Sequence, residues 1–249
     1  MTKPTPKLSI VIGALREEKR IGKTLNVLSN FLKDEGLDKS TEVIVVIADG
    51  GDRTLEVVSN LKSQFSNLVI IEPGKPFGKG RDIKTGMLAA HGLIRLYMDA
   101  DLATPLHHIK TVLSMFENEE PDIVIGTRKL SKIHEDLPRR LISVFGNFCF
   151  LLVSGFYSPD TQCGFKAFSA NATDICFNKL TRLKWSFDME LLTIANTNRL
   201  HVQQIALDDW QDIPNGTFKP SLGSSLQFFK DLLRIFSNRL IGKYKIRRV

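Results

Sequence analysis

The sequence predicts an α/β fold in which a mostly parallel β-sheet is flanked by helices. Strand-like and helix-like segments alternate along the first 126 residues, a pattern that is typical of right-handed βαβ units. The strand-like segments are continuous apolar runs, as in parallel strands buried on both faces. The last part of the chain is basic and amphipathic instead. We therefore expect an α/β domain over residues 1–220 and a C-terminal amphipathic helical extension over 221–249.

In the first half of the chain, the expected strands are short apolar runs and the expected helices have apolar residues three or four positions apart. Ile21, Leu25, Leu28 and Leu32 show this helical spacing, and Pro105 is typical of a helix start. In order, the pattern predicts strand 8–12, helix 17–32, strand 42–48, helix 52–65, strand 68–71, helix 79–90, strand 93–98, helix 105–117 and strand 122–126.

The alternation weakens after residue 130, where fewer strands are expected. The remaining segments are predicted as helix 138–153, strand 162–168, helix 187–196, strand 202–207 and helix 222–241.

Two carboxylates, Asp99 and Asp101, directly follow the expected strand 93–98. Open α/β sheets bind ligands outside the carboxyl ends of their strands. Two acids at that edge can hold Mg2+ or Mn2+ against a diphosphate, because both ions prefer oxygen ligands. The alternative interpretation is a strand end with two solvated acids.

Glycine-rich segments follow other strands. The segment Asp49-Gly50-Gly51-Asp52 offers an acid that can accept a hydrogen bond from a base or ribose, and the alternative is a turn in which Asp52 caps a helix. The segment Gly78-Lys79-Gly80 precedes a helix, where backbone N–H groups and a lysine favour phosphate. Its alternative is an ordinary glycine-rich turn.

Several cations and polar residues lie downstream. Arg128 follows the fifth expected strand, and Arg139, Arg140 and Ser143 come soon after. Such a set of side chains is suited to binding a phosphate group. The alternative is that the arginines are solvated surface residues. Gln162 lies in a dense polar segment, 160–166. Asp188 or Glu190 is a candidate active-site acid, and the alternative is that Ser186 and Asp188 cap a helix.

Charge and cysteine content point to a partner and a compartment. The net charge is +7, and residues 230–249 hold seven Lys or Arg against one acid, which indicates a nucleic acid or an anionic membrane surface nearby. The three cysteines form no Cys-x-x-Cys, which argues against zinc and disulfides and fits a reducing cytosol. The uncharged run 141–159 is interrupted by glycine and asparagine, so we expect a buried or in-plane helix.

The order and spacing of these motifs resemble the family 2 glycosyltransferases of GT-A fold, specifically the dolichyl-phosphate (polyprenyl-phosphate) glucosyl- and mannosyltransferases. The resemblance runs from about Leu8 to about Leu233. The segment 99–104 is closer to the glucosyl branch, because the mannosyl branch usually has glutamine where this chain has Ala103. The chain departs from the family at 13–16 and 48–51, segments that contact the nucleotide base in the family.

The resemblance implies a Rossmann-like GT-A sheet and inverting, metal-dependent transfer of a hexose, glucose favoured and mannose next. The donor would be UDP-glucose or GDP-mannose and the acceptor a polyprenyl or dolichyl phosphate, with the enzyme peripheral on the cytoplasmic face of an anionic membrane. The implied donor residues are Glu17 and Asp49 for the nucleoside, Lys79, Asp99 for ribose or sugar, and Asp101 for Mg2+ or Mn2+. The acceptor phosphate would be held by Arg128, Arg139, Arg140 and Ser143, with Gln162 and the acid Asp188 as further candidates.

Two other interpretations stay open at this point. A sugar-phosphate nucleotidyltransferase has an N-terminal loop vaguely like residues 13–22, although the expected double glycine is missing. A basic nucleic-acid-binding protein could use the C-terminal segment, but aromatic residues are sparse there and no known module is present, so no nucleic-acid partner is expected.

Overall fold

The structure is a computed structural model that describes residues 4–128, 149–211 and 222–246, except for the side chains of 222–226. Within these ranges the sheet has seven strands in the order β3-β2-β1-β4-β6-β5-β7. Strand β6 runs antiparallel to both of its neighbours, and the other pairs are parallel. The strands are β1 (Leu8–Ala14), β2 (Thr41–Ile47), β3 (Leu68–Ile71), β4 (Ile94–Met98), β5 (Ile123–Arg128), β6 (Phe165–Ser169) and β7 (Val202–Leu207).

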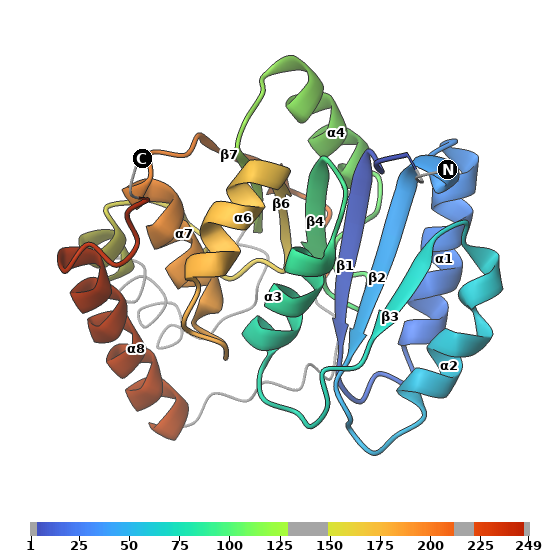
Figure 1. The fold of residues 1–249 in the computed structure, drawn as a ribbon, viewed down its shortest axis with the longest axis horizontal. Helices are drawn as coiled ribbons and strands as arrows, with labels where there is room; N and C mark the ends of the chain where they lie inside the picture. The colour runs from blue at the N-terminus through green and yellow to red at the C-terminus, as the bar shows by residue number, and fades with distance from the viewer. Residues whose placement is uncertain (1–3, 129–148, 212–221, 247–249) are drawn as a thin grey trace.

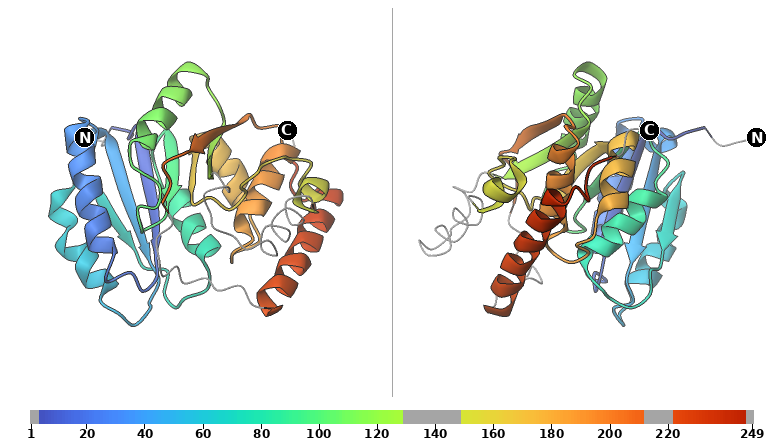
Figure 2. Two further views of the ribbon diagram at one scale, coloured as in Figure 1. Left: turned by 180° about the vertical axis from the view of Figure 1, so that it is seen from behind. Right: turned by 60° about the vertical axis from the view of Figure 1, so that its left-hand side comes forward.

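Helices cover both faces of this sheet (Figures 1 and 2). One core layer joins the sheet to α1 (Ile21–Asp34), α2 (Thr54–Asn60) and α4 (His108–Asn118). The opposite layer joins it to α3 (Lys79–Ala89), α6 (Ala170–Lys179), α7 (Phe187–Thr197) and α8 (Leu222–Leu240). Along β1, Ile10 and Ile12 enter the first layer and Val11 enters the second, because successive strand side chains point to opposite faces. The expected mostly parallel, helix-flanked sheet is confirmed.

The element bounds differ from expectation where local signals were weak. The helix expected over 52–65 is α2 followed by a short 3-10 turn, η2 (Lys62–Gln64), and a second such turn, η1 (Asp38–Ser40), precedes β2. Helix α6 was not expected, because its sequence has little apolar periodicity; the Ser169 side chain caps it by accepting the Ala172 N–H. Of the helix expected over 138–153, only residues 149–153 are described; they are helical, and the helix continues to residue 154.

Several segments meet at one edge of the sheet, the lower edge in Figure 1. The parallel strands β1, β2, β4 and β5 all end there. Strand β6 begins at the same edge because it is antiparallel, with Phe165 opposite Met98. The loops after these strands and the segment before β6 are therefore brought together, although they are far apart in the sequence.

Candidate active site

A partly exposed ion pair lies at the centre of this edge. Lys79, the first residue of α3, places its Nζ 2.5 Å from Oδ1 of Asp99, which follows β4. The ammonium also lies 5.9 Å from the centre of the Trp185 ring. Burial alone would lower the pKa of Lys79, but the charges of Asp99, Asp188 and Asp101 outweigh burial, and the pKa of Lys79 is raised. The lysine is therefore a fixed cation among carboxylates.

Two glycines allow the backbone to approach this pair closely. A Cβ at Gly164 would lie 1.9 Å from Oδ2 of Asp99, so only glycine leaves room for that carboxylate. A Cβ at Gly80 would lie 2.7 Å from Cβ of Phe187. The glycines of both motifs thus have packing roles, and the structure places Lys79 against the segment that precedes α7.

The loop that carries Asp101 is fixed by hydrogen bonds. Oδ1 of Asp101 accepts the Ala103 N–H at 3.0 Å, and Thr24 of α1 donates its hydroxyl to the Ala100 carbonyl at 2.6 Å. The Ala103 carbonyl accepts the Gln211 N–H at 3.0 Å. Asp101 is half-buried, as is Asp99. Two partly solvated carboxylates in a fixed loop form a donor set that fits Mg2+ or Mn2+.

A second ion pair lies beneath the first. Lys166 of β6 is fully buried and donates to Oδ1 of Asp188 at 2.6 Å and to the Cys163 carbonyl at 2.5 Å. The Tyr97 hydroxyl donates to the same carboxylate oxygen of Asp188. Burial, followed by the negative charge of Asp188, raises the pKa of Tyr97 well above its usual range. Asp188 is thus a buried carboxylate held by a lysine and a tyrosine.

Arg128, expected to hold a phosphate, forms a two-point ion pair with Asp160. Its Nε and Nη2 lie 2.5 and 2.9 Å from the two carboxylate oxygens, and its guanidinium lies 5.1 Å from the centre of the Trp210 ring. Burial opposes ionisation of Asp160, but the hydrogen bonds and charge of Arg128 prevail and hold the pKa of Asp160 below its usual range. Gln162 follows with an exposed side chain, and its N–H donates to Asp160 at 3.3 Å.

The two expected nucleoside contacts, Glu17 and Asp49, lie on loops at the ends of β1 and β2. Glu17 accepts two hydrogen bonds from Arg20, at 2.8 and 2.9 Å, whereas Asp49 is exposed and accepts the Gly51 N–H at 3.3 Å. The loops touch where Arg16 Nε donates to the Gly50 carbonyl at 3.1 Å. The structure therefore brings the two loops together. Arg139, Arg140 and Ser143 lie outside the described residues.

Two buried charges were not singled out from the sequence as parts of the site: Lys166 holds Asp188, and Asp160 holds Arg128. Glu190, the alternative to Asp188 as the active-site acid, is fully buried beside the loop before α7. Glu190 accepts the N–H groups of Thr181 and Arg182 and the Tyr244 hydroxyl. The sequence pattern that could have identified such residues is a charged residue inside an otherwise apolar segment, as with Lys166 within Gly164–Phe168.

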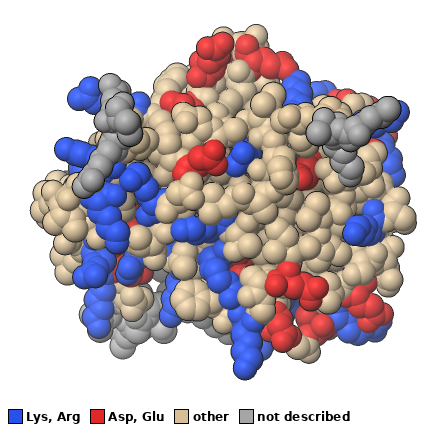
Figure 3. Space-filling view, viewed as in Figure 1, with Lys and Arg blue, Asp and Glu red and all other residues tan. Residues whose placement is uncertain are grey.

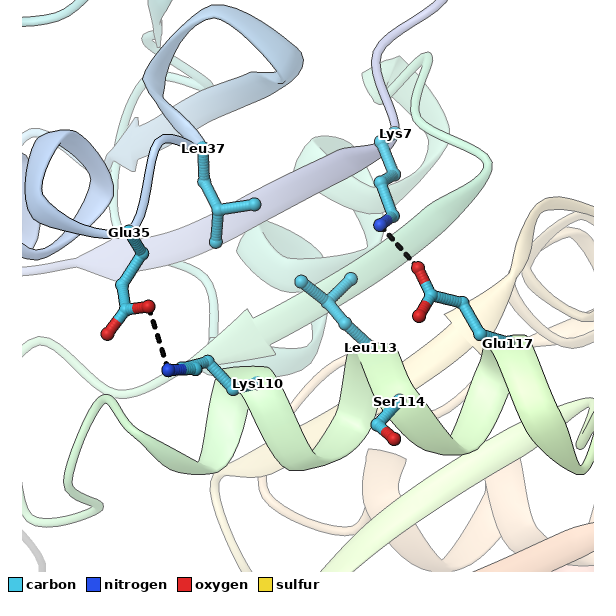
Figure 4. Close-up of a pocket in the computed structure, with 7 residues that line it drawn as sticks. All are labelled: Lys7, Glu35, Leu37, Lys110, Leu113, Ser114 and Glu117. Atoms are coloured by element: carbon cyan, nitrogen blue, oxygen red, sulfur yellow. Dashed lines mark hydrogen bonds and ion pairs between the residues drawn. The ribbon is translucent and has the colours of Figure 1, made fainter.

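One further cluster lies outside this edge. A pocket near the start of β1 is lined by two ion pairs, Lys7–Glu117 and Lys110–Glu35, on either side of two leucines, Leu37 and Leu113 (Figure 4). It lies at the opposite end of β1 from the site, because Leu8 begins that strand.

His107 and His108, at the start of α4, differ in burial. His107 is exposed, but His108 is buried and lies 2.7 Å from Asp209, which follows β7. Asp209 is 3.3 Å from His107 as well. The hydrogen bond from His108 is the main reason that the pKa of Asp209 is lowered. The contact ties the start of α4 to the segment after β7.

Comparison with solved structures identifies proteins that share the fold of this chain. Mannosyl-3-phosphoglycerate synthase from Rubrobacter xylanophilus superimposes with a TM-score of 0.66 at 14% identity, covering 98% of this chain and 77% of the other. Glucosyl-3-phosphoglycerate synthase from Mycobacterium tuberculosis, in complex with Mn2+, UDP and phosphoglyceric acid, gives 0.60 at 17% identity, covering 98% and 80%. The similarity establishes a GT-A fold.

Sequence comparison is more specific. A dolichyl-phosphate beta-glucosyltransferase of Trichomonas vaginalis is 32% identical over 245 residues, covering 94% of this chain and 74% of the relative. A human dolichyl-phosphate beta-glucosyltransferase is 30% identical over 259 residues, covering 98% and 79%. The family model described as Glycosyl transferase family 2 matches residues 9–185, which include Asp99, Asp101 and Lys79. The chain belongs to glycosyl transferase family 2.

Proposed function

We propose that this chain transfers glucose from UDP-glucose to a polyprenyl phosphate of the dolichyl type, inverting the anomeric carbon and releasing UDP. Relatives that are about 30% identical over nearly the whole chain are dolichyl-phosphate beta-glucosyltransferases. A β-linked product from an α-linked donor requires inversion. Family membership favours this transfer over nucleotidyl transfer and over nucleic-acid binding.

The observation that carries the proposal is the cluster of Lys79, Asp99 and Asp101 at the carboxyl edge of the sheet. Asp101, assisted by Asp99, would hold Mg2+ or Mn2+. A divalent ion bound there supplies positive charge against the leaving diphosphate. Lys79 is the matching fixed cation of the chain itself, and it keeps its proton because three carboxylates surround it.

The loops that carry Glu17 and Asp49 are proposed to hold the uridine. Both follow strands whose ends face the cluster, and the Arg16–Gly50 contact keeps them together. Asp49 is exposed and accessible to a base or ribose, whereas Glu17 is engaged by Arg20. We therefore expect Asp49 to make the direct contact and Glu17 to shape the loop.

The acceptor phosphate is proposed to bind near Arg128, with Arg139, Arg140 and Ser143 completing its site. Asp160 holds Nε and Nη2 of Arg128, which orients the guanidinium. A phosphate monoester has a second pKa of about 6 and is mostly ionised at pH 7. The acceptor therefore needs no protein base, and Asp188 is better suited to position Lys166 and Tyr97 than to remove a proton.

The enzyme is proposed to work at the cytoplasmic face of an anionic membrane, because its acceptor carries a lipid chain. Among the described helices, none combines the length and apolar character needed to cross a bilayer. Contact with the membrane would then come from the surface of the domain and from the basic C-terminal segment.

Labelled UDP-glucose and GDP-mannose, each offered with and without polyprenyl phosphate, test the proposal. We expect a lipid-soluble product from UDP-glucose that requires both the acceptor and Mg2+ or Mn2+. Product formed from GDP-mannose but not from UDP-glucose would contradict the assignment of glucose as the transferred sugar. Release of pyrophosphate without lipid product would contradict glycosyl transfer as the reaction. In the same assay Arg139→Ala should raise the KM for polyprenyl phosphate roughly ten- to hundredfold and leave the KM for the donor unchanged.

A further inference from the structure

Helix α8 has two separate apolar stripes. The side chains of Leu232, Ile235 and, further along, Asn238 are buried against the domain. A different set of large apolar residues faces outward, and their exposed fractions are high for aromatic and aliphatic groups: Phe229 42%, Leu233 69%, Phe236 39% and Leu240 69%. Their spacing of four, three and four residues places them on one stripe, named here the outer ridge of α8.

The inner face fixes the orientation of this ridge. Asp231 accepts the Ser186 hydroxyl at 2.7 Å and faces Arg182 at 3.5 Å, and Arg239 donates to the Val153 carbonyl at 2.6 Å. The Tyr244 hydroxyl, past the end of the helix, reaches the buried Glu190. With the middle and the C-terminal end of the helix held by polar contacts, the outer ridge cannot turn inward to hide its apolar side chains.

Basic side chains border the ridge along one side. Lys230 and Arg234 are exposed on the next stripe of the helix, and Lys243 and Lys245 are exposed just beyond it. In Figure 3, Lys and Arg gather over the region of α7 and α8, and most of the acids on this face lie elsewhere. An apolar stripe with a basic border matches the boundary between acyl chains and anionic head groups.

The ridge is also linked to the candidate active site. Asp231 contacts the segment 182–186, and Trp185 of that segment lies beside Lys79. The segment 182–186 therefore connects the inner face of α8 with the Lys79–Asp99 pair.

We propose that the outer ridge of α8 lies in the plane of an anionic bilayer, with Phe229, Leu233, Phe236 and Leu240 inserted and the basic border on the head groups. The proposal rests on the proposed function, because a lipid-linked acceptor must be met at a membrane. It assigns the contact to one stripe of one helix rather than to the charged C-terminal segment as a whole.

The test compares the full chain with a Leu233→Asp/Leu240→Asp variant and a matched control, Leu93→Asp. Leu93 is 60% exposed but lies at the opposite edge of the sheet, just before β4. Flotation with vesicles of phosphatidylcholine and phosphatidylserine should show a loss of binding of roughly tenfold or more per leucine in the variant and none in the control. The melting temperature should match that of the wild type, because both leucines are exposed.

Several results would overturn the proposal: equal binding of wild type and ridge variant, failure of the wild type to bind these vesicles, or equal binding to pure phosphatidylcholine. A wild-type dimer that the substitutions dissociate, with vesicle binding unchanged, would make the ridge a contact between two copies of the chain. Transfer to polyprenyl phosphate in detergent is measured in parallel. There the ridge variant should stay active, and absence of product from the wild type would contradict the proposed function while the vesicle experiment still reports on the ridge.

Discussion

Two lysine–aspartate pairs lie at the same edge of the sheet and differ mainly in their contact with solvent. The Lys79–Asp99 pair is 2.5 Å long, and its side chains are 24% and 39% exposed. The Lys166–Asp188 pair is 2.6 Å long, and its side chains are 0% and 5% exposed. The two pairs thus join the same chemical groups at nearly the same distance but in different surroundings.

The difference follows from desolvation. An exposed pair gains little net energy, so either partner can exchange its contact for a ligand at small cost. A buried pair was removed from water when the protein folded, and each charge then depends on the other. We infer that Lys79 and Asp99 are available to substrate, whereas Lys166 and Asp188 form the rigid support beneath them.

Breaking the buried pair should have the largest effect. Lys166→Met removes the ammonium bonded to the buried carboxylate of Asp188, and it should lower the free energy of unfolding by about 3–5 kcal/mol. Urea denaturation measures the change. The double variant Lys166→Met/Asp188→Leu should recover much of the loss because neither charge of this pair remains. A double variant as unstable as the single one would show that packing, not charge pairing, explains the effect.

Removing charge from the exposed cluster should affect activity and not folding. Asp101→Asn keeps the oxygen that accepts the Ala103 N–H but removes the negative charge, so kcat/KM should fall roughly 100- to 1,000-fold, about 2.7–4 kcal/mol of transition-state stabilisation. Initial rates with varied Mg2+ or Mn2+ measure the loss, and an unchanged melting temperature confirms the fold. Near-native turnover, or full wild-type activity in excess EDTA, would contradict the metal role of Asp101.

The third pair, Arg128–Asp160, should give the smallest effect and a defined pH dependence. Asp160→Asn weakens two charge-assisted hydrogen bonds and should lower the free energy of unfolding by about 1.5–3 kcal/mol at pH 7. Because the folded pKa of Asp160 is lowered, the stabilisation is complete above the unfolded value of about 3.9 and is lost as the pH falls through the folded value. Melting temperatures of both proteins should therefore converge only at the acidic end. A constant difference down to the most acid pH would contradict the ion pair as its source.

The sequence by itself determined the strands and the residues at their ends. Continuous apolar runs such as 42–48 have few alternatives to a buried strand, and Asp99 and Asp101 follow such a run directly, so their position at the sheet edge follows from local pattern. The helix α6 escaped prediction because its sequence lacks a clear apolar face and tertiary packing stabilises it instead.

Only the tertiary structure decided which charges pair. Strand β6 enters the sheet antiparallel between β4 and β5, and this single choice places Gly164 against Asp99, Lys166 against Asp188 and the segment before β6 against Arg128. Arg128 and Asp160 are 32 residues apart, and Lys166 and Asp188 are 22 apart, so no local periodicity relates them. The strength of each pair depends on burial, which is a property of the packed chain and not of the residues themselves.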